Sequence, residues 1–260
     1  MRYMPLRPAR LLLFILLHST QSWAQHDTLL LDTVPILATR IPGPLERLGR
    51  HVEVVDQRLL RGTVRPELAE VLRNHTAIDV RQRGPFDVQT DLSIRGGTYD
   101  QALVLIDGIP MSDPQTGHHL MDLPLLANAL ERVEVSYSGA SRTFGAGAFS
   151  GAVNLITRRP TKTAGSFTVD GGEYGSWRLR GDQTWHHKGF GVMVNAFHGR
   201  SDGAVPNSDF SQSGVHLNLG KMWKNVELRG QGGWSSKRFG AQNFYSSLYP
   251  DQQEYTRTLI

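Results

Sequence analysis

The feature that most constrains the fold is an alternation of apolar and polar residues along the last hundred positions of this 260-residue chain. In one segment, Val215, Leu217 and Leu219 are each separated by a polar residue. Successive side chains of a strand point to opposite faces, so such a segment predicts a strand with one apolar face. The alternating segments are Ser166–Asp170, Ser176–Trp185, Phe190–His198, Gly214–Met222 and Val226–Trp234. Segments of about ten residues are typical of a transmembrane β-barrel wall.

The connections between these segments also alternate in length. Residues His186–Gly189 and Trp223–Asn225 form short connections, whereas Gly199–Ser213 is long and polar. Short turns on one side and long loops on the other are expected of an outer-membrane barrel. A soluble antiparallel sandwich also alternates and stays open as the other interpretation.

The first 24 residues predict a secretory signal peptide. Three arginines precede the apolar run Leu11–Leu17, and Ala24 completes a small-residue cleavage site before Gln25. The run is too short to span a bilayer. Removing three arginines and no acid lowers the formal net charge from +4 to +1, so the basic balance is partly a targeting signal. We therefore expect export and no nucleic-acid partner.

Two further regions lie between the signal peptide and the alternating segments. Residues 25–44 are short and contain three prolines, which predicts an extended arm without a core. Residues 45–160 mix helical and strand patterns and predict a compact α+β domain. Its expected strands are His51–Val55, Ala102–Ile106, Arg132–Ser136 and Ala152–Thr157, and its expected helix is Pro66–Asn74. The run Ala102–Ile106 is uninterruptedly apolar and is followed by Asp107-Gly108, which predicts a buried strand that enters a tight turn.

Four motifs of this domain resemble, in order, those of the plug domain of TonB-dependent outer-membrane receptors. Leu92–Gly97 resembles the "IRG" strand end, and Gln101–Pro110 resembles the "LVLIDG" strand and turn. Leu130–Val135 resembles the "ERIEV" strand, and Ser138–Thr157 resembles the glycine-rich closing segment. Upstream, Asp32–Ala38 resembles the TonB box, an extended peptide that docks on a periplasmic partner, although Pro35 stands where valine is usual.

The resemblance implies an α+β plug domain followed by antiparallel β-strands of an incomplete transmembrane β-barrel, located in the bacterial outer membrane. Its partners would be TonB, outer-membrane lipid, and a metal-chelate or vitamin-like ligand of the ferric siderophore, haem or cobalamin class. The TonB-contacting residues would be Asp32, Thr33, Val34, Pro35, Ile36, Leu37 and Ala38. Arg95 and Arg132 would contact the barrel wall. The ligand-facing residues would be Tyr99, Gln115, Thr116, His118 and His119.

The sequence offers no catalytic, cofactor or metal site. With no cysteine there is no thiolate nucleophile or cysteine-ligated metal. His118 and His119 have Asp113 and Asp122 nearby, but adjacent histidines on a strand would point to opposite faces. The acidic loop 202–209 lacks the spacing of an EF-hand, and the glycines of 145–151 lack that of a dinucleotide loop. We therefore predict that the chain is not an enzyme.

The length of the chain bears on the expected transport function. Plugged outer-membrane transporters have about 22 strands, whereas the hundred residues after Pro160 suffice for about five. The sequence thus predicts an N-terminal fragment: signal peptide 1–24, TonB-box arm 25–44, plug 45–160, and the first strands of a truncated barrel in 161–260. The alternatives are a secreted or periplasmic binding module with a soluble β-sandwich, and a non-functional truncated receptor.

Overall fold

The structure is a computed structural model that describes residues 51–62, 67–111, 116–137, 140–224, 226–244, 246 and 248–260. The expected signal peptide and the expected TonB-box arm lie outside these residues. We refer to residues 51–157 as the plug and to residues 164–259 as the wall, and both belong to one compact unit. In the described part of the chain, no helix has the length and apolar character needed to cross a membrane.

The plug is built on a mixed sheet of five strands in the order β1-β6-β7-β4-β5. Strand β4 runs parallel to β7, and the other pairs are antiparallel. The strands are β1 (Val52–Asp56), β4 (Ala102–Ile106), β5 (Ile109–Met111), β6 (Leu130–Ser136) and β7 (Gly151–Thr157). The predicted Asp-Gly turn joins β4 to β5, and both of its residues have positive φ, 49° at Asp107 and 83° at Gly108. This is the backbone form of a two-residue hairpin turn.

The helices of the plug are short. They are α2 (Gln57–Gly62), α3 (Leu68–His75), α4 (Ser141–Phe144) and the 3-10 turns η2 (Tyr99–Gln101), η3 (Gly117–His119), η4 (Ala127–Ala129) and η5 (Ala146–Ala148). Helix α3 is amphipathic, with Val71 and Leu72 buried in the main core beside Val104 and Leu155. The Asp87 carboxylate accepts the backbone N–H of Leu68 at 3.0 Å and so caps the start of α3.

A second, two-stranded sheet completes the plug. Strands β2 (Ile78–Arg83) and β3 (Gln89–Ile94) pair as an antiparallel hairpin. Its turn, residues 84–88, includes two non-glycine residues with positive φ, Phe86 and Asp87. Gln89 and Asp91 are polar yet buried, because Arg83 binds both side chains.

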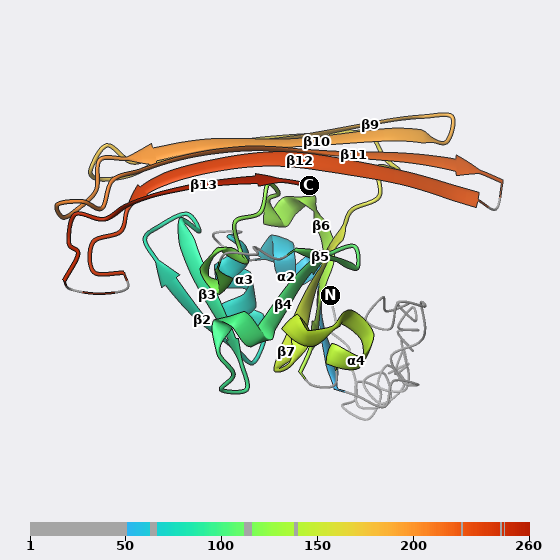
Figure 1. Ribbon diagram of the computed structural model, residues 1–260. Helices are drawn as coiled ribbons and strands as arrows, with labels where there is room; N and C mark the ends of the chain where they lie inside the picture. Colours follow the sequence, from blue (N-terminus) through green and yellow to red (C-terminus); the bar gives the residue numbers. More distant parts are fainter. Residues whose placement is uncertain are drawn as a thin grey trace, which may run out of the picture. The chain divides into compact units, whose positions relative to one another are not determined.

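The wall is a meander of six antiparallel strands in sequence order, which lie side by side in Figure 1. They are β8 (Ala164–Gly171), β9 (Trp177–His187), β10 (Phe190–Ser201), β11 (Phe210–Trp223), β12 (Val226–Gly240) and β13 (Gln253–Leu259). Tight connections join β9 to β10 and β11 to β12, whereas longer loops follow β8, β10 and β12. The tight connections lie at one end of the strands, which we call the tight-turn end, and the longer loops lie at the other, which we call the long-loop end.

The two faces of the wall are reversed relative to a soluble sheet. Its buried residues are mostly polar, including Arg178, Asn195, Gln212, His216, Asn218 and Lys237. Its exposed residues are mostly apolar, including Phe167, Trp185, Leu217, Trp223, Val226 and Leu228. A soluble sandwich would bury its apolar face between two sheets, so this arrangement favours a membrane wall and confirms the predicted fold class.

Several predicted elements differ in extent from those observed. All five predicted wall strands are present, but β10 and β11 are longer than predicted, which shortens the polar loop between them to residues 202–209. A sixth strand, β13, pairs with β12. His118 and His119 belong to the 3-10 turn η3, so the strand geometry used to argue against a shared metal site does not apply to them.

Candidate functional site between plug and wall

At the tight-turn end, the Asp-Gly turn and the last residue of β7 contact the wall. The Asp107 carboxylate accepts the backbone N–H of Thr157 at 3.0 Å and its hydroxyl at 2.6 Å. From β12, Arg229 donates to the Thr157 hydroxyl oxygen at 2.7 Å, with Asp107 3.4 Å away. From β11, the Asn218 amide donates to the same oxygen at 2.9 Å. The end of the plug sheet is thus bound by two wall strands.

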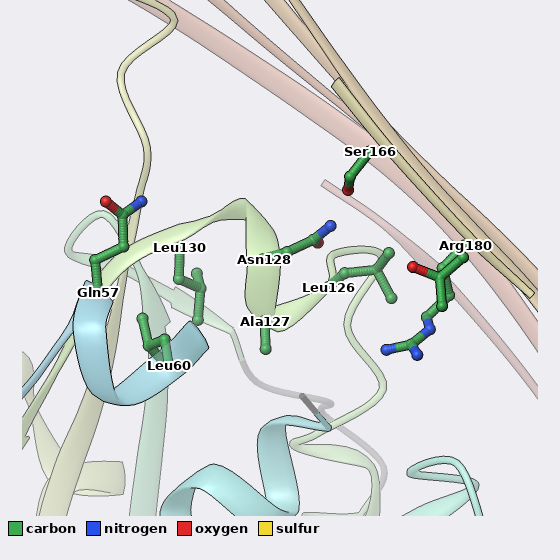
Figure 2. Close-up of a pocket in the computed structure, with 9 residues that line it drawn as sticks. Gln57, Leu60, Leu126, Ala127, Asn128, Leu130, Ser166 and Arg180 are labelled. Carbon is green, nitrogen blue, oxygen red and sulfur yellow. The ribbon is translucent and has the colours of Figure 1, made fainter. Parts of the chain in front are cut away.

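In the middle of the wall, Asp182 of β9 collects three donors. These are the Asn128 amide at 2.6 Å, the Arg158 guanidinium at 3.0 Å, and the hydroxyl of Ser166 on β8. Beside them lies a cavity of about 190 Å³. Figure 2 shows Ser166 and Arg180 extending from the wall toward Asn128 and Leu126 of the plug. This cavity is a gap between the two parts, lined on the wall side by polar residues.

Toward the long-loop end, two buried cations of the wall reach acidic groups of the plug. Lys237 of β12 donates to the Asp122 carboxylate at 2.8 Å, and both side chains are at most 5% exposed. Arg178 of β9 lies 3.6 Å from the Glu67 carboxylate and over the ring of Phe86, 5.3 Å from its centroid. Buried charges are costly unless they are paired, so plug and wall depend on one another here.

The acids of this region differ in the direction of their pKa shifts. Burial raises the pKa of the Asp87 carboxyl despite the nearby Lys237 and Arg178, and one of its two oxygens is buried without a hydrogen-bond partner. Burial also raises the pKa of Glu67. At Asp122, burial works in the same direction, but Lys237 and His119 outweigh it, and the pKa lies below its ordinary value. Asp122 is therefore a carboxylate that the wall cation Lys237 stabilises as an anion.

A largely apolar cavity of about 310 Å³ opens at the long-loop end. Val88 and Pro85 of the plug turn line one side, and Phe210 and Phe239 of the wall line another. Residues from the three long loops complete it, among them Tyr174, Val205 and Phe244. Ligand pockets are concave and mostly apolar with a few polar groups. This cavity is therefore the best candidate for a ligand-facing site in the described chain.

The predicted ligand-facing residues fall into two groups. Tyr99 stacks on His118 with ring centroids 4.0 Å apart, and the Thr116 hydroxyl oxygen accepts the backbone N–H of His118. The other histidine, His119, faces the wall, 3.2 Å from Asp122 and 3.6 Å from Glu254 of β13. Neither group lines the long-loop cavity. Gln115 lies outside the described residues, and a ligand-facing role for these five residues stays a prediction.

The two arginines predicted to contact the wall have contacts inside the plug. Arg132 binds Glu131 and Glu134, both on β6. Arg95 lies over the ring of Tyr137, 5.5 Å from its centroid. The predicted wall contact of these arginines stays untested. Across the described residues, no group of three or more histidine, aspartate or glutamate side chains is placed to bind a metal ion.

Sequence reasoning missed the wall residues that bind the plug. Asp182, Asn218, Arg229 and Lys237 are all polar residues of strands in which apolar residues alternate. The available signal was that the polar face of a predicted wall strand carries long charged or amide side chains. That signal identifies a face but not the plug residue that each side chain meets.

Comparison with known proteins agrees with this architecture. Residues 44–152 match the family model described as TonB-dependent Receptor Plug Domain. A vitamin B12 transporter, BtuB of Vibrio vulnificus, is 29% identical over 135 residues, which are 52% of this chain and 22% of the transporter. The chain thus spans about a quarter of the length of such relatives.

Solved structures show the same fold. The pyoverdine receptor FpvA of Pseudomonas aeruginosa PAO1 superposes with a TM-score of 0.61 at 16% identity, covering 79% of this chain and 30% of the receptor. The siderophore receptor PiuA of Acinetobacter baumannii gives a TM-score of 0.56 at 21% identity, covering 75% of this chain and 27% of the receptor.

A mixed α/β plug bound to the polar face of an antiparallel wall is a fold that this chain shares with solved receptor structures. Residues 44–152 of the chain therefore carry a domain that matches the plug of TonB-dependent receptors. This confirms the predicted outer-membrane location. The relatives and structural neighbours are transporters and receptors, which also confirms the prediction that the chain is not an enzyme.

Proposed function

We propose that this chain is the plug and first wall strands of a receptor that takes up a scarce ligand across the outer membrane by an energised rearrangement of the plug. The observation that supports it most directly is the reversed wall, whose polar face binds the plug while its apolar face is exposed. A plug bound through ion pairs and hydrogen bonds can be rearranged with little exposure of apolar surface.

The ligand belongs to the cobalamin, ferric siderophore or haem class. Relatives from two Vibrio species are named vitamin B12 transporters, and structural neighbours are named receptors for pyoverdine or ferric catecholates. The apolar cavity at the long-loop end provides a surface for an aromatic or aliphatic part of such a ligand. The polar group around Tyr99 and His118 is a second candidate contact.

Energy reaches the plug through residues 32–38, the segment that resembles a TonB box. An extended peptide adds to a partner sheet through backbone hydrogen bonds, and Pro35 removes one donor. We therefore expect Pro35 either to occupy an unpaired position of the docked peptide or to weaken docking.

The test removes residues 32–38 from the full protein in cells and measures surface binding and uptake separately. The probes are radiolabelled cyanocobalamin, an iron-loaded siderophore and haemin. We expect the deletion to abolish energised uptake while surface binding continues. Deleting residues 39–43 is the control, because it shortens the arm and leaves the box intact. Uptake that survives loss of 32–38 would show that this segment is not the TonB box, and failure to bind any probe would exclude the proposed ligand classes.

A further inference from the structure

The plug turn at residues 84–88 is bound to the wall through its backbone. Three successive carbonyls accept hydrogen bonds from wall side chains. Gln212 of β11 donates to the Phe86 carbonyl at 2.9 Å. Lys237 of β12 donates to the Asp87 carbonyl at 2.7 Å and to the Val88 carbonyl at 3.4 Å. Such contacts recognise the shape of the turn rather than its side chains.

The conformation of this turn needs support from outside. Phe86 and Asp87 have φ of 57° and 55°, a region that residues with a Cβ seldom adopt. Within the turn, the backbone contact is a 3.2 Å hydrogen bond from Val88 N–H to the Pro85 carbonyl. The carbonyl contacts from the wall therefore stabilise a backbone form that is intrinsically disfavoured.

Lys237 also connects the turn to a second plug segment. An ammonium group has three donor hydrogens, and those of Lys237 face the Asp87 carbonyl, the Val88 carbonyl and the Asp122 carboxylate. Asp122 lies between the turns η3 and η4, well away from the β2–β3 hairpin in sequence. One buried wall cation thus joins two separate plug segments.

The 84–88 turn also contacts the long-loop cavity and the start of α3. Its residues Pro85 and Val88 line the long-loop cavity. Its Asp87 side chain caps α3 by accepting the backbone N–H of Leu68. A change in the conformation of the turn therefore alters both the lining of the cavity and the hydrogen bond that caps α3.

We propose that Lys237 is a positioning residue that fixes the 84–88 turn, and with it the plug side of the long-loop cavity and the start of α3. The significance for ligand uptake rests on the proposed function, whereas the positioning itself does not. Release of the Lys237 contacts frees the turn, loosens the cap of α3 and changes the shape of the cavity.

The test is hydrogen exchange of backbone amides in the protein in outer-membrane vesicles, without ligand or energy source. Lys237→Met removes three charge-assisted hydrogen bonds. We expect exchange to accelerate roughly ten- to hundredfold in residues 84–89 and in the first turn of α3. Strands β6 and β7 of the same plug should keep their wild-type exchange.

Two further variants separate positioning from a general loss of stability. Lys237→Arg keeps a charged donor and should restore most of the protection of the turn. Lys221→Met is the matched control, because Lys221 lies exposed on β11 and donates to the Lys188 carbonyl at the tight-turn end. It should leave the turn unchanged.

Three results would overturn the proposal. They are unchanged exchange at 84–89 in Lys237→Met, an equal increase in β6 and β7, or no recovery with arginine. Because the measurement uses no ligand, a failure here is distinguishable from a failure of the proposed uptake, which the box deletion tests.

Discussion

Because one face of the wall is apolar and exposed, we predict that a charged residue placed on it destabilises the protein by an amount that depends on its depth in the membrane. Leu217 lies on this face of β11, six residues before Trp223, which is 74% exposed beside a tight turn. Aromatic residues of outer-membrane barrels cluster at the interface, and strands tilt by about 40°. At about 3.3 Å per residue, six residues span about 20 Å along the strand and about 15 Å across the membrane. Leu217 is thus near the centre of an apolar band about 25 Å tall.

Leu217→Arg should therefore destabilise the protein folded in a bilayer by about 2–4 kcal/mol. The matched variant is Val226→Arg, since Val226 pairs with Trp223 and lies at the interface. Its expected cost is about 0–1 kcal/mol. The assay is reversible folding from guanidinium into phospholipid vesicles, followed by tryptophan fluorescence. Equal costs at the two positions, or two costs near zero, would refute the reasoning and show that this face contacts water.

Two further predictions concern the contact between plug and wall. Gly233→Ala should destabilise the protein by about 1–3 kcal/mol in chemical denaturation, because a Cβ there would lie 2.7 Å from Pro124 of the plug. The control is Gly230→Ala, whose Cβ would meet no atom within 4 Å and which should be neutral or stabilising. Equal effects of the two substitutions would contradict a close approach at Gly233. Asp122→Asn should destabilise at pH 7 with an effect that fades as the pH falls below about 4, because a lowered pKa contributes stability above the unfolded value and loses it on protonation. Asp87→Asn should instead stabilise the protein at pH 7, since the pKa of Asp87 is raised and its ionised form is disfavoured in the folded state. Chemical denaturation of both variants at several pH values measures these effects. If the two variants change stability with pH in the same way, the assigned directions are refuted.

Local sequence patterns predicted the elements that depend on local physics. The run Ala102–Ile106 is strand β4 with its predicted bounds, because a continuous apolar segment followed by Asp-Gly is sufficient information. The alternation predicted the wall for the same reason. The ends of β10 and β11 were missed, since Arg200, Ser201 and Ser211 carry no apolar alternation and continue the strands only through pairing with their neighbours.

Elements that depend on distant partners could not be predicted. Gln89 and Asp91 belong to a polar run, and they are buried because Arg83 and His118 bind their side chains. The 3-10 turn at His118 and His119 is likewise set by contacts with Asp91, Asp122 and Glu254. No periodicity encodes such pairings.

The same limit applies to the candidate site. Lys237 and Asp122 are 115 residues apart in the chain. The alternation assigned Lys237 no face, because the predicted strand ended at Trp234. Only the observed length of β12, which continues to Gly240, brings this lysine to the plug.

Because the inner face of the wall is polar, separating the plug from the wall and unfolding the plug should differ in their change of heat capacity. Exposing polar groups to water lowers the heat capacity, whereas exposing apolar groups raises it. Separating plug from wall exposes polar side chains such as Asn195 and His216, and their negative contribution offsets part of the increase from apolar groups that become exposed at the same time. Unfolding the plug itself exposes Leu72, Leu105 and Leu155, and its heat capacity must rise steeply. A movement of the intact plug is therefore far less sensitive to temperature than its unfolding, and calorimetry distinguishes the two.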